Sequence, residues 1–376
     1  MVSLQDIATI NPKSDPLQNT FIYIDLEAVE KGELRKIQEI MREEAPSRAQ
    51  RVIDNNDILF QCVRPYQKNN YIHRILNTSN QQWVASTGYA QIRTTELPNY
   101  IYHLLNTDEF NRKVMVRCTG SSYPAINSED LATIHLYYTP DKKEQLKISR
   151  LLDLLDKRIA TQNKIIEDLK KLKSAISKYL FARKDLLETT ICLSNIATLK
   201  NGYAFQSGKY NALGKWKILT ITNVPGERYI NDEDCNCIIN LPNDIQDHQV
   251  LKEGDILISL TGNVGRVSLC KNGNYLLNQR VGLLQLAKNV NQEFLYQILS
   301  SQRFENSMIA CGQGAAQMNI GKGDVENYVL PYSSNGNNIL FAAKILHSYD
   351  ECIINELRRL TLLTMQKQYL LTQMFI

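Results

Sequence analysis

The chain has 376 residues, of which 43% are hydrophobic and 22% charged, and its formal net charge is +4. This composition predicts an ordinary globular protein of two or three domains, and it excludes wholesale disorder, a collagen-like repeat and a disulfide-rich miniprotein. No run of 18 or more apolar residues occurs, so we expect neither a membrane-spanning helix nor a membrane partner. The first residues, Met1–Ile10, lack the basic and apolar regions of a signal peptide, and we therefore expect a cytoplasmic protein with reduced cysteines.

The first 140 residues are predicted to form a mixed α/β domain with a strand-rich core. The β-rich run Phe21–Leu26 is typical of a buried strand, and a helical stretch is expected near Tyr100–Lys113. Residues 141–184 are predicted to form one long helix, because no Gly or Pro occurs between Asp141 and Arg183. Apolar residues recur along it in the heptad pattern of a coiled-coil seam. The predicted seam consists of Leu152, Leu155, Ile159, Ile166, Leu169 and Ile176.

Residues 185–337 are predicted to form a second mixed α/β domain. β-rich runs at Asp255–Leu260 and Gly265–Cys270 precede a helical stretch near Phe294–Met308. Residues 338–376 are predicted to form a second long helix, which again contains no Gly or Pro. Its predicted seam consists of Leu346, Tyr349, Ile353, Leu360, Leu363 and Leu370.

The two halves of the chain resemble each other. Tyr100–Leu105 falls on Phe294–Leu299 at an offset of 194 residues, and the same offset carries Lys173 of the first seam onto Lys367 of the second. We therefore expect an α+β protein with a pseudo-twofold internal repeat, in which two mixed α/β domains are joined by two long helices that form an antiparallel coiled coil. The alternative is that each helix packs only on its own domain. Against it, a seam of about 33 residues is about 50 Å long, which exceeds most globular helices.

Signatures of enzyme chemistry are missing from the sequence. It contains no Walker A phosphate loop, no G-x-S-x-G nucleophile elbow, no H-E-x-x-H zinc motif and no Asn-Pro-Pro-aromatic run of an adenine-N6 methyltransferase. The eight cysteines and five histidines form no set with the spacing of a metal site. We therefore expect a non-catalytic chain with no metal or cofactor of its own.

Several motifs in the two domains carry a family resemblance. They are Val84–Tyr89 in the first half and, in the second half, Asn201–Ser207 followed by Tyr210, Gly254–Ile258, Thr261–Gly265, Leu277–Gln279 and Gly312–Ile320. Together with the paired helices, they resemble the specificity (S) subunits of type I restriction-modification systems over essentially the whole chain. The first half departs from the commonest family pattern, because Asn11-Pro12-Lys13 stands where the second half has Asn201-Gly202-Tyr203. The two halves are therefore expected to read different sequences.

The resemblance implies a DNA-reading subunit with two target recognition domains, residues 1–140 and 185–337. Each domain would read one half of a bipartite, asymmetric target in double-stranded DNA. The helices at 141–184 and 338–376 would act as a spacer and would dock two methyltransferase (M) subunits, which bring S-adenosylmethionine. Restriction (R) subunits would join through the complex and would bring chemistry that depends on ATP and Mg.

Polar and aromatic side chains near these motifs are the candidate DNA contacts, because Arg, Lys, Asn, Gln, Ser and Thr read base edges and aromatic rings stack on bases. In the first domain the candidates are Arg64, Tyr66, Lys68, Ser86, Thr87, Tyr89, Arg117, Ser121, Ser122 and Tyr123. In the second domain they are Asn201, Tyr203, Ser207, Lys209, Thr261, Asn263, Arg266, Asn278, Gln279, Arg280, Gln313 and Gln317.

The charge is unevenly distributed along the chain. Residues 1–140 and 185–337 each carry a net −2, residues 141–184 carry +7 and residues 338–376 carry +1. Since Lys and Arg supply much of the affinity for DNA, the chain alone is expected to bind DNA weakly. Two alternative functions stay open: a coiled-coil scaffold with two protein-interaction lobes that does not bind DNA, and a self-contained enzyme, which the missing motifs disfavour.

Overall fold

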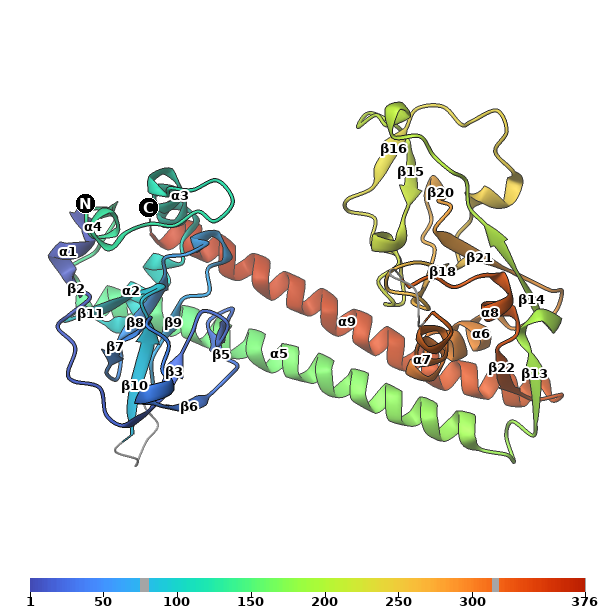
Figure 1. Ribbon diagram of the computed structural model, residues 1–376, viewed down its shortest axis with the longest axis horizontal. Coiled ribbons are helices and arrows are strands. Elements are labelled where there is room, and N and C mark those ends of the chain that lie inside the picture. The colour runs from blue at the N-terminus through green and yellow to red at the C-terminus, as the bar shows by residue number, and fades with distance from the viewer. Residues whose placement is uncertain (75–80, 313–317, 376) are drawn as a thin grey trace. The chain divides into compact units, whose positions relative to one another are not determined.

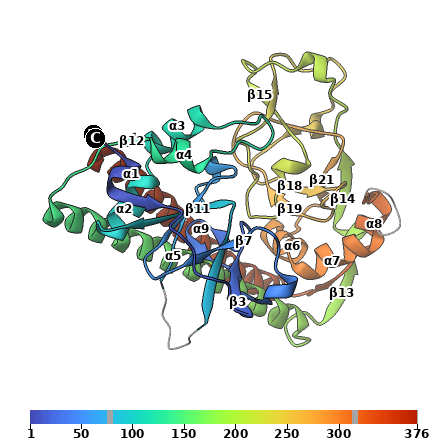
Figure 2. The same ribbon diagram turned by 60° about the vertical axis from the view of Figure 1, so that its left-hand side comes forward.

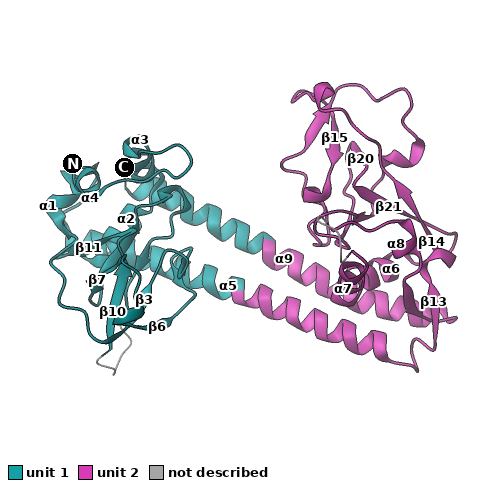
Figure 3. Cartoon of the chain, viewed as in Figure 1, with its two compact units in different colours: residues 1–163, 358–376 teal, residues 164–357 magenta. Residues whose placement is uncertain are grey.

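The computed structural model describes residues 1–74, 81–312 and 318–375 (Figure 1). The chain forms two compact units (Figure 3). Unit 1 contains Met1–Asn163 and Arg358–Ile376, and unit 2 contains Lys164–Leu357. The division into four consecutive segments stays a prediction, whereas each compact unit combines one strand-rich domain with parts of both long helices.

Unit 1 begins with short strands and ends with part of the helix pair. Its elements are β1 (Val2–Ser3), α1 (Leu4–Ile7), β2 (Ala8–Ile10), β3 (Thr20–Ile24), β4 (Val29–Glu30), β5 (Glu33–Leu34), β6 (Gln38–Met41), β7 (Ala49–Ile53), β8 (Ile58–Gln61), β9 (Tyr71–Ile72), β10 (Gln82–Ser86), β11 (Tyr89–Thr94), α2 (Pro98–Leu105), α3 (Asp108–Arg117), α4 (Ser128–Ala132), β12 (His135–Leu136), the first part of α5 (Lys142–Ala182) and the last part of α9 (Gly336–Met374).

Unit 2 contains the remaining parts of α5 and α9. Its other elements are β13 (Thr189–Cys192), β14 (Ala197–Asn201), β15 (Trp216–Leu219), β16 (Asn236–Ile238), β17 (Val250–Leu251), β18 (Ile256–Ser259), β19 (Val267–Leu269), β20 (Tyr275–Leu277), β21 (Val281–Leu286), α6 (Gln292–Leu299), α7 (Gln302–Cys311), α8 (Lys322–Glu326) and β22 (Val329–Tyr332).

The two units share one sheet topology, which confirms the predicted α+β fold with an internal repeat. The sheet β2-β11-β8-β9 of unit 1 corresponds to β14-β21-β18-β19 of unit 2, and β6-β3-β10-β7 corresponds to β16-β15-β20-β17. In both units one pair of the second sheet is parallel, β3 with β10 and β15 with β20. The helices α2, α3 and α4 precede α6, α7 and α8 by 194 residues.

One central strand in each unit separates two hydrophobic clusters. Ile58 and Phe60 of β8 pack in the cluster that contains helix α2, whereas Leu59 packs on the other side with Trp83 of the second sheet. In unit 2, Ile258 of β18 packs with helix α6 (Figures 1 and 2) and Leu257 packs in the cluster of the second sheet. This alternation follows from the two-residue period of a strand, and it explains why both strands are apolar throughout their buried length.

The two long helices run antiparallel within each unit. In unit 1, Lys367 of α9 bonds to Asp156 of α5. In unit 2, Lys173 Nζ of α5 donates to Asp350 Oδ1 of α9 at 2.6 Å. The two ion pairs are equivalent at the offset of 194 residues, so the lysines that interrupt both apolar seams form the same contact in each copy.

All predicted seam residues are buried or half-buried. Leu152 packs in one cluster with Leu371 of α9 but also with Tyr100 of α2, so α5 contacts its own domain as well as the other helix. In unit 2, Leu346 likewise clusters with Leu180 of α5. The interpretation that each helix packs only on its own domain is therefore wrong for the described residues.

Within the described residues, no helix is long and apolar enough to cross a membrane.

A buried histidine makes the stability of unit 1 depend on pH. The His73 side chain is 0% exposed. Its ring lies 4.8 Å from that of Trp83, and neither ring nitrogen has a hydrogen-bond partner among the described residues. Burial lowers the pKa of His73 from 6.5 to about 4. The folded unit therefore keeps this imidazole neutral at pH values at which the unfolded chain would protonate it.

We expect the unfolding free energy of unit 1 to fall by up to about 3 kcal/mol as the pH decreases from about 6.5 to about 4, because only the unfolded state gains the His73 proton in that range. Urea unfolding of a Trp216→Phe variant, in which Trp83 fluorescence reports on unit 1, measures this change. Adding His73→Phe should remove most of the dependence of this unfolding free energy on pH over the same range. An identical slope with and without His73 would assign the pH dependence to other groups.

Candidate nucleic-acid interface

A junction of three loops occurs at the same place in both units. In unit 2, Leu260 N donates to Arg280 O at 3.0 Å and Ile320 N donates to Leu260 O at 2.9 Å. In unit 1, Cys62 N donates to Gly88 O at 3.0 Å, and Ile126 N donates to Cys62 O at 3.1 Å. We call these segments the loop junction: residues 62–64, 86–88 and 119–126 in unit 1, and residues 260–262, 278–280 and 318–320 in unit 2.

Candidate residues of unit 2 converge on this junction. Tyr203 N donates to Leu277 O at 2.8 Å, and Gln279 N donates to Tyr203 O at 3.0 Å. An isolated bridge joins Thr261 to Asn319. Backbone hydrogen bonds thus bring together five candidates from three distant parts of the sequence: Tyr203, Thr261, Asn278, Gln279 and Arg280.

The side chains of this group differ in what they offer to a ligand. Gln279 and Arg280 are exposed. The Tyr203 hydroxyl donates to Asp244 Oδ1 at 2.8 Å, and this hydrogen bond raises the pKa of Tyr203. Thr261 Oγ1 is buried and has no partner among the described residues. Among the described residues of this junction, the Arg280 guanidinium is therefore the positive charge that unit 2 presents.

The remaining candidates of unit 2 lie beside the junction or outside the described residues. Asn201, Ser207, Lys209 and Asn263 are exposed. Arg266 Nε lies 3.5 Å from Glu305 Oε1, so that charge already has a partner. The two that lie outside the described residues are Gln313 and Gln317.

The junction of unit 1 presents a different set of side chains. The Arg64 guanidinium lies over the Tyr123 ring, 4.3 Å from its centroid. Arg64 N donates to Pro124 O at 2.7 Å, which fixes the backbone of both loops. Arg64 has a φ of +55°, at the place where unit 2 has Gly262 with a φ of +71°. Tyr66 is 50% exposed and Tyr123 64% exposed. Ser121 and Ser122 of the same loop are also exposed.

Two further candidates of unit 1 are buried, and two others form polar contacts within the domain. Ser86 and Tyr89 are buried in the sheet, and the Tyr89 hydroxyl donates to Asp25 O at 3.2 Å. Arg117 Nη1 donates to Asp130 O at 2.7 Å and ties α3 to α4. Lys68 Nζ donates to Asp108 Oδ1 at 2.6 Å. We correct the expectation for Ser86 and Tyr89, because their side chains are enclosed, whereas a DNA contact by Lys68 or Arg117 stays a prediction. Thr87 is half-buried at the junction.

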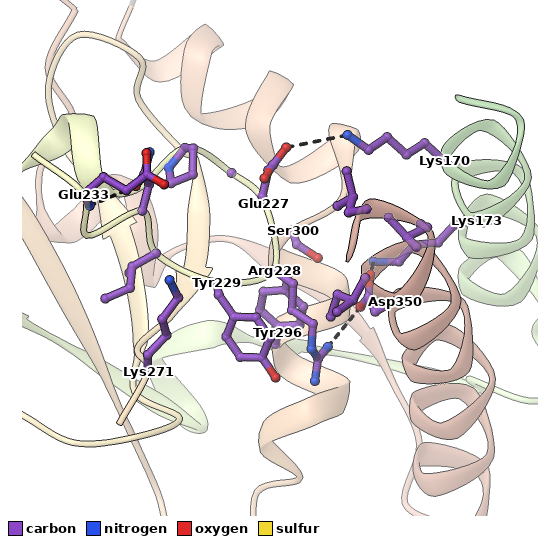
Figure 4. A pocket seen from close by; sticks show the side chains of 17 residues that line it. Lys170, Lys173, Glu227, Arg228, Tyr229, Glu233, Lys271, Tyr296, Ser300 and Asp350 are labelled. Atoms are coloured by element: carbon purple, nitrogen blue, oxygen red, sulfur yellow. Dashed lines mark hydrogen bonds and ion pairs between the residues drawn. The ribbon is translucent and has the colours of Figure 1, made fainter. Parts of the chain in front are cut away.

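Two hollows of unit 2 were not predicted from the sequence as cavities. One, of about 450 Å³, lies between Tyr203, Lys209 and the segment Ile238–Asn243. The other, of about 770 Å³, lies between residues 225–233 and both long helices, and it contains Arg228 and Asp350 (Figure 4). The aromatic residues between Tyr203 and Tyr210 were a sequence signal for the first hollow, whereas the sequence contained no signal for the second.

Among the described residues, no cluster of His, Cys, Asp or Glu could hold a metal ion.

Comparisons with known proteins agree with this architecture. Residues 1–171 and 188–365 match the model of the type I restriction modification DNA specificity domain. The chain is 27% identical over 233 residues to the type I restriction enzyme MjaVIII specificity subunit of Methanocaldococcus jannaschii, covering 56% of this chain and 53% of that protein. It is 24% identical over 176 residues to the HindI specificity subunit of Haemophilus influenzae, covering 46% and 35%. The matches thus span about half or less of the length of these two relatives.

Two solved structures share the fold. One is the S subunit of the type I restriction-modification system from M. genitalium, with a TM-score of 0.60, 16% identity, and coverage of 100% of this chain and 95% of that one. The other comes from work on complex assembly and conformational transition of the type I R-M system, with a TM-score of 0.60, 19% identity, and coverage of 100% and 96%. Because the two matches to the family model together cover nearly the whole chain, the chain belongs to the family of type I restriction modification DNA specificity domains.

Proposed function

We propose that this chain is a specificity subunit that binds double-stranded DNA and has no catalytic activity of its own. Each strand-rich domain reads one half of a bipartite, asymmetric target. The observation that carries the proposal is the loop junction, which both units build with the same backbone hydrogen bonds but with different side chains. A shared scaffold with Arg64 and Tyr123 in one copy and Tyr203 and Arg280 in the other fits two readers of unlike sequences.

The partners of the proposed complex supply its chemistry. Two methyltransferase subunits dock on the helix pair and bring S-adenosylmethionine, and restriction subunits bring ATP- and Mg-dependent cleavage. A cytoplasmic location fits these partners. The domains themselves each carry a net −2, so tight binding requires cationic surface from the partners. A scaffold that does not bind DNA is the second candidate, because the helix pair alone would suit either role.

Selection from a random duplex library tests the proposal. The chain would be purified together with its methyltransferase subunit and incubated with the library, and the bound duplexes would be sequenced. We expect two short specific elements separated by a fixed number of unspecified base pairs. Retention of no duplex, with or without the methyltransferase, would favour the scaffold. Enrichment of one continuous element would contradict the two-domain reading.

Replacing Arg280 with alanine should reduce the selectivity for one base at a single position of the DNA target. Arg280 is exposed at the junction of unit 2, and an arginine that reads guanine contributes about 1–3 kcal/mol of discrimination. Binding competition among duplexes with single base changes measures the effect. Lys209→Ala provides the comparison, because a cation that contacts only phosphate weakens binding to all sequences alike. Uniform weakening by Arg280→Ala would make Arg280 a phosphate contact instead.

A further inference from the structure

A third hollow of unit 2, of about 420 Å³, lies between helix α5 and the turn that joins α6 to α7. We call it the basic hollow after the four cations that line it, which are Lys170, Lys173, Lys178 and Arg303. Among the described residues that line it, there is no Asp or Glu. Its volume lies within the range of sites that bind small ligands.

The four cations of the basic hollow differ in how far acidic groups neutralise them. Lys173 Nζ lies 2.6 Å from Asp350 Oδ1, and Lys170 Nζ lies 3.6 Å from Glu227 Oε1 in an exposed pair. Such an exposed pair contributes little to holding its charge. The side chains of the other two cations, Lys178 and Arg303, are exposed and form no ion pair within the described part of the chain. A cavity that gathers positive charge in this way favours an anionic ligand.

Neutral hydrogen-bond donors lie beside these cations. The hydroxyls of Ser174 and Ser177 have no hydrogen-bond partner among the described residues, and both residues line the hollow. The Ser301 side chain caps α7, but the backbone N–H groups of Gln302 and Arg303 donate to no described acceptor. Helix N-termini, Lys and Arg are common ligands of phosphate. Together these groups supply more donors than the two oxygens of a carboxylate can accept, whereas a phosphate monoester has three terminal oxygens.

A buried acceptor also lines the basic hollow. Gln297 is 2% exposed, and its Nε2 donates to Glu293 Oε1 at 2.7 Å and to Asp350 Oδ2 at 2.6 Å. Because both partners are carboxylates, the amide nitrogen has to face them, and Gln297 Oε1 is left without a partner among the described residues. An unpaired buried acceptor is unfavourable and calls for a donor. A ligand that carries a hydroxyl group as well as a phosphate would satisfy both requirements.

The internal repeat provides a comparison, because the equivalent positions of unit 1 lack most of these charges. At the offset of 194 residues, three of the four cations are replaced, and their counterparts are Thr364, Thr372 and Glu109. Asp108, the first residue of the equivalent helix α3, already accepts hydrogen bonds from Lys68 and Gln368. The shared fold therefore does not require the cations, and their presence in unit 2 indicates a role in binding.

We propose that the basic hollow binds a small phosphate monoester that carries a hydroxyl group, of the class of sugar phosphates and nucleotides. The phosphate lies between the two unpaired cations and the first turn of α7, and a hydroxyl group donates to Gln297 Oε1. Lys170, Lys173 and Ser300 line both this hollow and the larger one, so a longer ligand has room to extend beyond the phosphate (Figure 4). This site is separate from the loop junction, and the inference does not rest on DNA reading by the chain.

Calorimetric titration of the full chain with ribose 5-phosphate tests the proposal. The variant is Lys178→Gln with Arg303→Gln, and the matched control is Lys184→Gln with Lys288→Gln, which replaces two exposed lysines of unit 2 outside the hollow. We expect the dissociation constant to rise about tenfold or more in the variant, because charge-assisted hydrogen bonds are lost, and to stay unchanged in the control. Since the replaced side chains are exposed, both variants should keep the unfolding midpoint of the native chain.

Further ligands identify the group that the hollow recognises. Ribose without a phosphate should not bind, and inorganic phosphate should bind more weakly than ribose 5-phosphate because it lacks the sugar hydroxyls. Ser177→Ala should weaken the binding of ribose 5-phosphate without lowering stability. Binding should also tighten as the pH rises through about 6, where the phosphate monoester gains its second charge.

Three results would overturn the proposal. The first is that the native chain binds neither ribose 5-phosphate nor inorganic phosphate. The second is that the variant and the control have equal dissociation constants for ribose 5-phosphate. The third is that the variant loses affinity only for a DNA duplex without terminal phosphates, which would make Lys178 and Arg303 contacts of the DNA backbone. Equal affinity for inorganic phosphate and ribose 5-phosphate would contradict the contact with Gln297 Oε1.

Discussion

Replacing Arg228 with methionine should lower the unfolding free energy of unit 2 by about 3–5 kcal/mol, because it leaves the half-buried Glu293 without its cationic partner and removes one of the two cations bonded to the buried Asp350. The Arg228 side chain is 8% exposed and joins residues of α6 and α9. Nη2 donates to Glu293 Oε2 at 2.7 Å, and Nη1 donates to Asp350 Oδ2 at 3.0 Å. Figure 4 shows the contact with Asp350 at the side of the larger hollow.

The decrease in unfolding free energy caused by Arg228→Met should be smaller at acidic pH. Burial alone would raise the pKa of Glu293, but its hydrogen bonds to Arg228 and Gln297 outweigh that effect and lower the pKa below its ordinary value. The stabilisation from this carboxylate is therefore present above the pKa of the unfolded chain and is lost as the pH falls through the lower folded pKa. We expect the stability difference between the native chain and Arg228→Met to narrow below about pH 4.

Urea unfolding of a Trp83→Phe background, in which Trp216 fluorescence reports on unit 2, measures both effects. Arg266→Met provides a matched control, because the Arg266 side chain is 40% exposed and its contact with Glu305 is 3.5 Å long. Such an exposed pair is worth about 0–1 kcal/mol. Equal losses in the two variants would show that the buried network around Arg228 has no special role in stability.

Replacing Gly202 with alanine should disrupt the loop junction of unit 2. The strand-rich domain of unit 2 should then no longer recognise its half of the DNA target. A Cβ atom at Gly202 would lie 2.1 Å from Asn278 O and 2.6 Å from Leu277 O. Both are backbone atoms of the segment that presents Asn278, Gln279 and Arg280, so the chain has to move apart there. Overpacking of this kind costs about 1–3 kcal/mol or more, and the displaced segment would no longer hold its side chains together.

Gly208→Ala is the control, because it adds the same methyl group six residues later with no atom within 4 Å. We expect Gly208→Ala to keep both stability and target specificity. The selection from a random duplex library should return only the element read by unit 1 when the complex carries Gly202→Ala. A complete two-part target in that experiment would remove residues 201–203 and 278–280 from the interface.

Much of the fold could be predicted from the sequence because it depends on local patterns and on repetition. The heptads located α5 and α9, and the lysine shared by both seams, Lys173 and Lys367, proved to form equivalent ion pairs with Asp350 and Asp156. The constant offset also predicted that α2 and α6 would occupy the same place in the two units.

The interface could be predicted only in part, because it depends on contacts between distant segments. Nothing in the sequence near Ser86 and Tyr89 shows that both faces of β10 and β11 are covered there, so these residues resembled an exposed motif although they are buried. The partners of Lys68 and Arg117 come from other segments, and these partners take up their charge or donors. Arg228 gave no signal at all, because a buried arginine is recognised only when Glu293 and Asp350 are brought beside it by the fold.

The central claim is that this chain selects the DNA sequence that its partners modify. Methylome sequencing of cells with and without the gene for this chain, with the methyltransferase gene kept in place, tests it most directly. The claim predicts that methylation of one bipartite, asymmetric adenine motif disappears with the gene and returns when the gene is restored. A methylome in which no such motif depends on the gene would contradict it.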